Sequence, residues 1–214
     1  MKYVLWDWNG TLLDDTKAAV AALNGMLARR GLDPIGLPFY REHFAFPVRP
    51  FYERIGFVLA NEDWDALARE YHAAYAAEPK ALNVQALEAV RSLQSAGIGQ
   101  SVISALRQDL LDQATVETGV APYMDRICGT DNLDGASKLD RARELMRDLM
   151  CRPKAVRAEE VVLIGDALHD KEVADALGVR CVLCGQGSHA QHRLAAVAPT
   201  GDDLFGAVAL ALRT

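Results

Sequence analysis

Residues 3–13, with the sequence YVLWDWNGTLL, decide the fold. Residues 3–6 are apolar or aromatic and predict a short buried strand that ends at Asp7, where Asn9-Gly10 gives a turn signal. A carboxylate at the carboxyl end of a buried strand, followed by a loop of small residues, lies where open α/β sheets bind ligands. Backbone N–H groups of such a loop can hold a phosphate, and Thr11 adds a hydroxyl. The alternative interpretation is that Asp7 only forms a turn.

Size and composition limit the classes of protein that fit. The chain has 214 residues, half of them hydrophobic, which suits one α/β core with a modest insertion. Its net charge of −6 argues against sequence-independent binding of nucleic acid or anionic membranes, because both need a basic surface. No run is long enough for a signal peptide or a spanning helix, so we expect a cytoplasmic protein, as a monomer or a homodimer.

The four cysteines are few for this length and suit a reducing compartment. Cys181 and Cys184 have redox-motif spacing, but they lie in an apolar run that reads as a strand. Their side chains would then point to opposite faces of the sheet, so we expect plain buried residues and no redox pair.

The region after the first strand differs from the rest of the chain. Residues 14–16 provide N-cap chemistry for a helix that stops at Gly31. The following region, to about residue 82, is rich in aromatic residues and proline and shows no strand pattern. We expect helices near 39–44, 48–55 and 62–77 there. The sequence therefore predicts an all-helical cap of residues 14–82, inserted into a core of residues 1–13 and 83–214.

From Asn83 onward, helical and strand patterns alternate. Asn83 should cap a helix that ends at Ala96, and the most apolar strand covers residues 161–164. The other expected strands are 98–103, ending at Ser104, 126–128 and 179–183; the other expected helices are 109–118, 137–150, 171–177 and 202–212. Such alternation indicates crossover connections, hence a three-layer Rossmann-like α/β core with a parallel sheet.

Polar groups follow three of these strands. Asp7 and Ser104 end two strands, and Asp166 and Asp170 follow a third after Gly165. Because the carboxyl ends of parallel strands share one edge of a sheet, these groups can converge although they are distant in sequence. Three carboxylates together form an oxygen-rich cluster suited to a hard cation such as Mg²⁺, which would relieve their mutual repulsion. The alternative is that Asp166 and Asp170 cap the following helix.

With these motifs, the chain resembles the haloacid dehalogenase superfamily of phosphohydrolases over essentially its whole length. The family's first motif, Asp-x-Asp-Gly-Thr, is matched by DWNGT at residues 7–11, and its fourth, Gly-Asp-x-x-x-Asp, by residues 165–170. Ser104 matches the second motif, and Lys138, within GASK at residues 135–138, matches the third. The helical insertion is similar to the cap of the phosphoglycolate phosphatase-like branch.

The resemblance implies a role for each motif residue. Asp7 would attack phosphorus and form an aspartyl-phosphate. Mg²⁺ would be held by Asp7, the carbonyl of Asn9, Asp166 and Asp170. The phosphoryl oxygens would be bound by Gly10, Thr11, Ser104, Ala105 and Lys138. The alternative for the lysine is an ordinary solvated side chain. The substrate would be a small phosphorylated metabolite.

One residue departs from the family pattern. The family's hydrolases usually carry a second Asp where this chain has Asn9, and that Asp protonates the leaving group and then activates water. An amide does neither, and general acid–base help is worth roughly 10²- to 10⁴-fold in rate. Three outcomes are open: a slow phosphatase, one restricted to good leaving groups such as anhydrides or acyl phosphates, or a protein that only binds a phosphorylated ligand or partner. We expect the protein to retain some hydrolytic activity, with Asp7, Asn9 and Lys138 as its catalytic residues, because the nucleophile and the metal-binding carboxylates are present.

The cap should select the substrate, as lids do. Arg41, His43 and Arg49 are candidates for an anionic leaving group, with solvated or paired side chains as the alternative. Phe46-Pro47 could form a pocket wall and Arg107 could face the site, whereas His169 and His189 receive no role.

Other chemistries fit less well. A dehalogenase needs no carboxylate cluster. Phosphonate cleavage would need a cap lysine that forms an imine, and the only candidates, Lys17 and Lys80, lie at the margins of the cap. Nucleotide transfer would need a loop ending in Gly-Lys-Ser/Thr, which the sequence does not contain.

Overall fold

A six-stranded parallel sheet forms the centre of the computed structural model, which describes residues 1–130 and 138–213. The strand order is β5-β4-β1-β6-β7-β8. The strands are β1 (Tyr3–Trp6), β4 (Gly99–Arg107), β5 (Arg126–Thr130), β6 (Val161–Gly165), β7 (Arg180–Cys184) and β8 (Thr200–Gly201). β1 lies between β4 and β6, with Tyr3 opposite Gly99 on one side and Val161 on the other. The chain order reverses around β1, which places its carboxyl end at the ligand-binding edge of the sheet.

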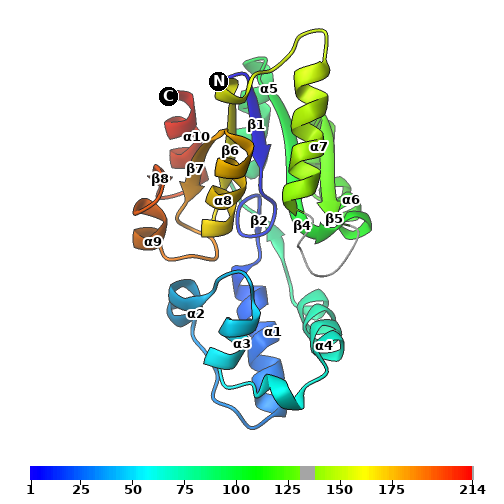
Figure 1. The fold of residues 1–214 in the computed structure, drawn as a ribbon, viewed down its shortest axis with the longest axis vertical. Coiled ribbons are helices and arrows are strands. Elements are labelled where there is room, and N and C mark those ends of the chain that lie inside the picture. The colour runs from blue at the N-terminus through cyan, green and yellow to red at the C-terminus, as the bar shows by residue number, and fades with distance from the viewer. Residues whose placement is uncertain (131–137, 214) are drawn as a thin grey trace.

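Helices cover both faces of this sheet, as Figure 1 shows. α5 (Ala86–Ser95), α6 (Gln108–Glu117) and α10 (Leu204–Arg213) pack on the face to which Val4 and Trp6 point. α7 (Lys138–Cys151), α8 (Leu168–Leu177) and α9 (Gln191–Ala195) pack on the face to which Tyr3 and Leu5 point. Because β1 is buried on both sides, it is apolar throughout, and the three-layer α/β prediction is confirmed.

Four further helices form a separate layer at the carboxyl edge of the sheet (Figure 1). They are α1 (Thr16–Arg29), α2 (Leu37–His43), α3 (Arg49–Arg54) and α4 (Trp64–Ala77). Aromatic side chains such as Tyr40, Phe51 and Phe57 pack with Leu23 and Leu27 of α1 into a core of their own. This group is the helical cap that the aromatic-rich sequence predicted.

Two short strands join the cap to the sheet. β2 (Leu13–Asp14) and β3 (Ala81–Leu82) pair antiparallel, with Leu13 opposite Leu82. The expectation that this region holds no strand missed this ribbon, because a two-residue strand has no readable periodicity. Both connections between cap and core therefore run through one small hydrogen-bonded unit.

Several expected bounds differ from the structure. Asn83 does not cap a helix: its Oδ1 accepts from the N–H of Gln85 in a turn, its Nδ2 donates to the carbonyl of Thr11, and α5 begins only at Ala86. β4 continues past Ser104 to Arg107, and α8 begins three residues before the expected start. β8 and α9 were missed, and three 3₁₀ turns add Leu59–Asn61, Ala121–Tyr123 and Ala158–Glu160.

The expected helix 137–150 appears as α7, which begins at Lys138, whereas residues 135–137 of the GASK motif lie outside the described residues. Cys181 and Cys184 are buried in β7 and belong to the clusters on opposite faces of the sheet, as predicted. Among residues 1–130 and 138–213, none of the helices combines the length and apolarity that a membrane crossing requires.

Candidate functional site

Three buried carboxylates meet at the carboxyl edge of the sheet. Asp7 follows β1, Asp166 follows β6, and Asp170 lies in the first turn of α8. One oxygen of each lies within 4.8 Å of the others, and the residues are 7%, 1% and 1% exposed. The convergence predicted from the parallel sheet is thus observed. Oxygen donors this close and this dry suit a hard divalent cation, since three unneutralised carboxylates would repel one another.

Lys138 supplies the only side-chain cation that is bonded to this cluster in the described part of the chain. Its Nζ donates to Oδ1 of Asp7 at 2.5 Å and to Oδ1 of Asp170 at 2.6 Å, and the residue is 3% exposed. Burial alone would lower the pKa of Lys138, but the two carboxylates raise it above its ordinary value. A solvated lysine, the alternative from the sequence, is therefore wrong.

The contacts with Lys138 leave Asp7 and Asp170 with pKa shifts in opposite directions. Burial raises the pKa of Asp170, but the Lys138 ammonium more than offsets this and holds it below the usual range. The pKa of Asp7 is raised well above its ordinary value, first by burial and then by the neighbouring carboxylates of Asp170 and Asp166, although Lys138 acts against this. One ammonium does not neutralise three carboxylates, so the residues present fit a further cation.

Asp166 occupies a space that two glycines leave open. A Cβ on Gly10 or on Gly187 would clash with its carboxylate. Its Oδ1 accepts from the Thr11 hydroxyl at 3.1 Å, and its Oδ2 accepts from the N–H of Ser188 at 2.5 Å. Burial, followed by the charge of Asp170, raises the pKa of Asp166 to about 7. Asp170 also accepts two backbone N–H bonds in the turn after β6, so the alternative helix-capping role coexists with its place in the cluster.

The phosphate-binding candidates from the first and second motifs lie beside this cluster. Gly10 has a φ of +79°, which glycine adopts without strain. Ser104 is buried in β4, and its Oγ donates to Oδ1 of Asn9 at 3.4 Å and accepts from the N–H of Leu106 at 3.0 Å. Ala105 follows Ser104 in the same strand. Thr11 donates to Asp166, which joins the first motif to the fourth.

Sequence reasoning missed two residues beside Asn9. Asp15 takes the N-cap position of α1, as predicted, but its side chain caps nothing. Its carboxylate instead accepts from Nδ2 of Asn9 and from the N–H of Gly10, each at 2.7 Å, and from the hydroxyl of Tyr75 in α4. Because an N-cap Asp is so common, no signal in the sequence distinguishes this one.

The cap candidates for substrate contact are mostly engaged elsewhere. The guanidinium of Arg41 donates to the backbone carbonyls of Gln186 and, at 2.9 Å, Gly187, in the loop after β7. Arg49 stacks over Trp64 within the cap, at 4.3 Å from guanidinium carbon to ring centroid.

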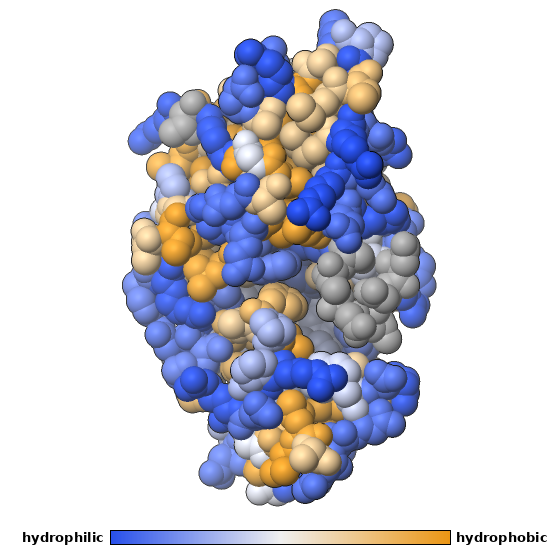
Figure 2. All heavy atoms as spheres, in the orientation of Figure 1, coloured by the Kyte–Doolittle hydropathy of each residue, from blue (hydrophilic) through white to orange (hydrophobic). Residues whose placement is uncertain are grey.

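Other candidates are placed as follows. His43 packs on Phe39, and Phe46 packs on His169 with 5.2 Å between ring centroids. Arg107 pairs with Asp109 on the surface. On the face shown in Figure 2, the surface is hollowed between the cap and the core.

His189 is a buried histidine to which the sequence analysis gave no role. Its Nδ1 accepts from the N–H of Leu168 at 3.0 Å, which leaves the proton on Nε2. Burial, with Arg193 nearby, lowers the pKa of His189 to about 4. The imidazole is therefore a neutral structural acceptor that holds the start of α8.

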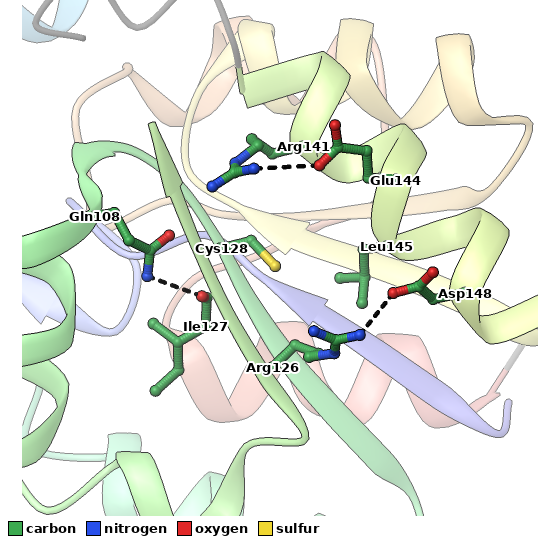
Figure 3. A pocket seen from close by; sticks show the side chains of 8 residues that line it. All are labelled: Gln108, Arg126, Ile127, Cys128, Arg141, Glu144, Leu145 and Asp148. Atoms are coloured by element: carbon green, nitrogen blue, oxygen red, sulfur yellow. Dashed lines mark hydrogen bonds and ion pairs between the residues drawn. The ribbon is translucent and has the colours of Figure 1, made fainter. Parts of the chain in front are cut away.

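A separate hollow of about 150 Å³ lies between β5 and α7 (Figure 3). Its charged side chains form two ion pairs, Arg126 with Asp148 and Arg141 with Glu144. Burial raises the pKa of its one thiol, Cys128, so that thiol is a weak nucleophile. No carboxylate of the Asp7 cluster lines this hollow, and the chemistry lies elsewhere.

Known proteins share this sequence pattern. The model of the haloacid dehalogenase-like hydrolase family matches residues 4–184. Phosphoglycolate phosphatase 1 of Pseudomonas aeruginosa is 25% identical over 207 residues, which cover 93% of this chain and 75% of that protein. A 5'-nucleotidase of the same organism is 30% identical over 207 residues, covering 92% and 88% of the two chains. A structure described as a predicted phosphatase from Clostridium acetobutylicum superposes with a TM-score of 0.79 at 19% identity, covering 99% and 98%.

A parallel α/β sheet whose strand ends gather an acid cluster and a buried lysine, under a helical cap, defines a class of hydrolytic enzyme. The chain belongs to the haloacid dehalogenase-like hydrolase family, as its sequence motifs predicted.

Proposed function

We propose that this protein is a Mg²⁺-dependent phosphatase that hydrolyses a small phosphorylated metabolite through an aspartyl-phosphate on Asp7. The observation that carries the proposal is the buried group of Asp7, Asp166, Asp170 and Lys138 at the carboxyl edge of the sheet. Both curated relatives described above are named for the hydrolysis of small phosphorylated molecules, which supports the substrate class.

Asp7 is the nucleophile in this scheme. An oxygen of its carboxylate forms a bond to phosphorus while the bond from phosphorus to the leaving oxygen breaks. Water then attacks the phosphorus of the acyl phosphate, which releases inorganic phosphate and returns the Asp7 carboxylate. Bound Mg²⁺, held by Asp7, the Asn9 carbonyl and Asp166 with support from Asp170, would offset the repulsion between carboxylate and phosphate.

Lys138 provides positive charge where negative charge develops on the phosphoryl oxygens. Its Nζ already lies 2.5 Å from Oδ1 of Asp7, so a phosphoryl group on that carboxylate is within reach of the ammonium. Thr11, Ser104, the loop at Gly10 and the N–H of Ala105 complete the proposed phosphate site.

Asn9 limits the proton transfers. The amide neither protonates a leaving alcohol nor removes a proton from water, and loss of that help slows a reaction by roughly 10²- to 10⁴-fold. Substrates with good leaving groups, such as acyl phosphates and anhydrides, need no proton and should be favoured. The alternative is a protein that binds a phosphorylated ligand or partner without turnover.

The test is phosphate release from a panel of phosphomonoesters, acyl phosphates and anhydrides, with Mg²⁺ and with EDTA. Wild type is compared with Asp7→Asn and Asn9→Asp. We expect release that requires both Mg²⁺ and Asp7 and is fastest for good leaving groups. If no substrate releases phosphate in an Asp7-dependent way, the result would favour the alternative, a protein that binds a phosphorylated ligand or partner without turnover. Since Asn-Gly pairs convert slowly to Asp, intact-mass analysis must show that each wild-type sample retains Asn9.

The same proposal includes the organisation of the chain. We propose that residues 14–82 act as the cap over a core of residues 1–13 and 83–214, and that the β2–β3 ribbon is the hinge. The four free cysteines support a reducing compartment such as the cytoplasm. A monomer or a homodimer remains a prediction.

A further inference from the structure

Asp15 carries a buried carboxylate that accepts three hydrogen bonds. The residue is 5% exposed, and its donors are Nδ2 of Asn9, the N–H of Gly10 and the hydroxyl of Tyr75. These donors come from the loop of the first motif and from the cap helix α4. Asp15 itself stands between the β2–β3 ribbon and α1, so the contact joins the core, the connection and the cap.

The three side chains form a closed ring. Nδ2 of Asn9 donates one hydrogen to Asp15 and the other, at 3.0 Å, to the Tyr75 hydroxyl, which in turn donates to Asp15. The ring fixes the amide, because the opposite orientation would place its oxygen against a carboxylate and leave Tyr75 without that donor. The Asn9 Oδ1 therefore faces the phosphate-binding candidate Ser104, 3.4 Å from its Oγ.

Tyr75 is itself held within the cap. Lys80 lies 4.5 Å from the centroid of its ring, and the Lys80 ammonium donates to the Tyr75 carbonyl at 2.7 Å. Tyr71, one turn earlier on α4, stacks against the same ring. The phenol therefore moves with the end of α4, and its bond to Asn9 exists only while the cap lies against the core.

We propose that Asp15 is the positioning residue for Asn9, and that Tyr75 makes this alignment conditional on cap closure. The inference rests on the proposed phosphatase function. In the fixed orientation, the Asn9 Oδ1 accepts a hydrogen bond from an attacking water or a substrate hydroxyl on the Ser104 side. It orients that group without taking its proton. Asn9 thus aligns the water or substrate hydroxyl but supplies no acid–base chemistry, and it does so only when the cap is closed.

The ring also explains how residues 9 and 15 depend on each other. Asn9→Asp alone would place two buried carboxylates where a donor and an acceptor now lie 2.7 Å apart. The exchange variant Asn9→Asp/Asp15→Asn keeps one donor and one acceptor in contact and moves the carboxylate to position 9. We therefore expect more Asp7-dependent turnover from the exchange variant than from Asn9→Asp.

The kinetic test measures Asp7-dependent phosphate release with Mg²⁺ for Asp15→Asn and Tyr75→Phe. Matched controls are Asp14→Asn, which changes the exposed neighbour, and Tyr71→Phe. A lost hydrogen bond to a charged group corresponds to roughly a 10- to 100-fold loss, which we expect in kcat for Asp15→Asn, with a smaller loss for Tyr75→Phe. The KM should change only a few-fold. Equal losses in Asp15→Asn and Asp14→Asn, or equal turnover in Asn9→Asp and the exchange variant, would overturn the proposal.

A second measurement does not depend on activity. The side-chain NH₂ signals of Asn9 in a ¹⁵N–¹H spectrum are identified by their loss in Asn9→Asp. We expect them to shift in Asp15→Asn and Tyr75→Phe and to stay unchanged in Asp14→Asn. If no variant releases phosphate but the signals shift, the positioning ring stands and the phosphatase function fails. If the Asn9 signals do not shift in either Asp15→Asn or Tyr75→Phe, the ring is refuted, whatever the activity of the variants.

Discussion

Lys138→Met is the perturbation that tests the cluster most directly. The substitution keeps the length and the apolar stem of the side chain but removes the ammonium that binds Asp7 and Asp170. All three groups are buried, so two carboxylates lose their counter-ion without gaining water. Removing one partner of a buried ion pair typically costs about 3–5 kcal/mol of unfolding free energy, and we expect a loss in that range.

The loss should depend on pH in a defined direction. Without Lys138, the pKa of Asp7 in the folded protein should rise further above the ordinary Asp value of 3.8, and the pKa of Asp170 should lose the lowering that the ammonium now provides and rise because of burial. A carboxyl whose pKa is raised by folding destabilises the protein once the pH passes that raised value, whereas protonation relieves the cost below it. The loss should therefore be larger at pH 8 than at pH 5.

The assay is urea unfolding in EDTA at both pH values, with Lys171→Met as the matched control. Lys171 pairs with Asp175 on the surface of α8, where a pair contributes about 0–1 kcal/mol. A Lys138→Met loss no greater than that of Lys171→Met would refute the buried counter-ion. A loss that is constant from pH 5 to pH 8 would refute the assignment of the cost to unpaired carboxylates.

Three further predictions concern the surroundings of the site. Gly187→Ala should weaken Mg²⁺ binding and lower the unfolding free energy by about 1–3 kcal/mol, since its Cβ meets the Asp166 carboxylate; titration with Mg²⁺ measures this. His189→Asn keeps an acceptor for the Leu168 N–H but removes a group whose pKa falls from 6.5 to about 4 on folding. Wild type should therefore lose about 1.4 kcal/mol per pH unit more than this variant as the pH falls from 6.5 to 4. Arg41→Ala should loosen the cap and speed proteolysis of the cap connections by about 10-fold, which timed digestion checks.

Each of these has a control or a contrary outcome. Gly25→Ala, in the middle of α1 with no atom closer than 3.7 Å to the new Cβ, should leave Mg²⁺ binding unchanged. Parallel stability curves for wild type and His189→Asn below pH 6.5 would contradict the neutral buried imidazole. Arg49→Ala removes a cap arginine that stacks on Trp64 and has no bond to the core in the described part of the chain, so equal proteolysis in both arginine variants would disprove the role of Arg41.

The core elements were readable from the sequence because their signals are local. Four apolar residues before Asp7, and four followed by Gly165 before Asp166, form short buried strands, and helical periodicity marks the intervals between the strands. A parallel sheet then brings their carboxyl ends to one edge by geometry alone. The acid cluster was therefore predictable because Asp7 and Asp166 directly follow parallel strands and Asp170 lies in the turn after the second of them.

The cap was readable only as a helical region. The ribbon that joins it to the sheet, the two-residue pairing of Leu13 with Leu82, lies below the length at which any pattern shows. Asn83 illustrates the limit further. Its sequence position predicts a helix cap, but its side chain donates a hydrogen bond to the carbonyl of Thr11, 72 residues earlier. Tertiary hydrogen bonds decided what local propensity left ambiguous.

The sequence by itself determined the five longer strands of the sheet, the nucleophile candidate and the departure at Asn9, since each is a property of neighbouring residues. Only the tertiary structure decided that Lys138 is a buried counter-ion and that Asp15 turns away from its helix to bind Asn9 and Tyr75. The physical reason is that a side chain's partner is set by what packing brings within about 3 Å, and packing joins residues that the chain separates.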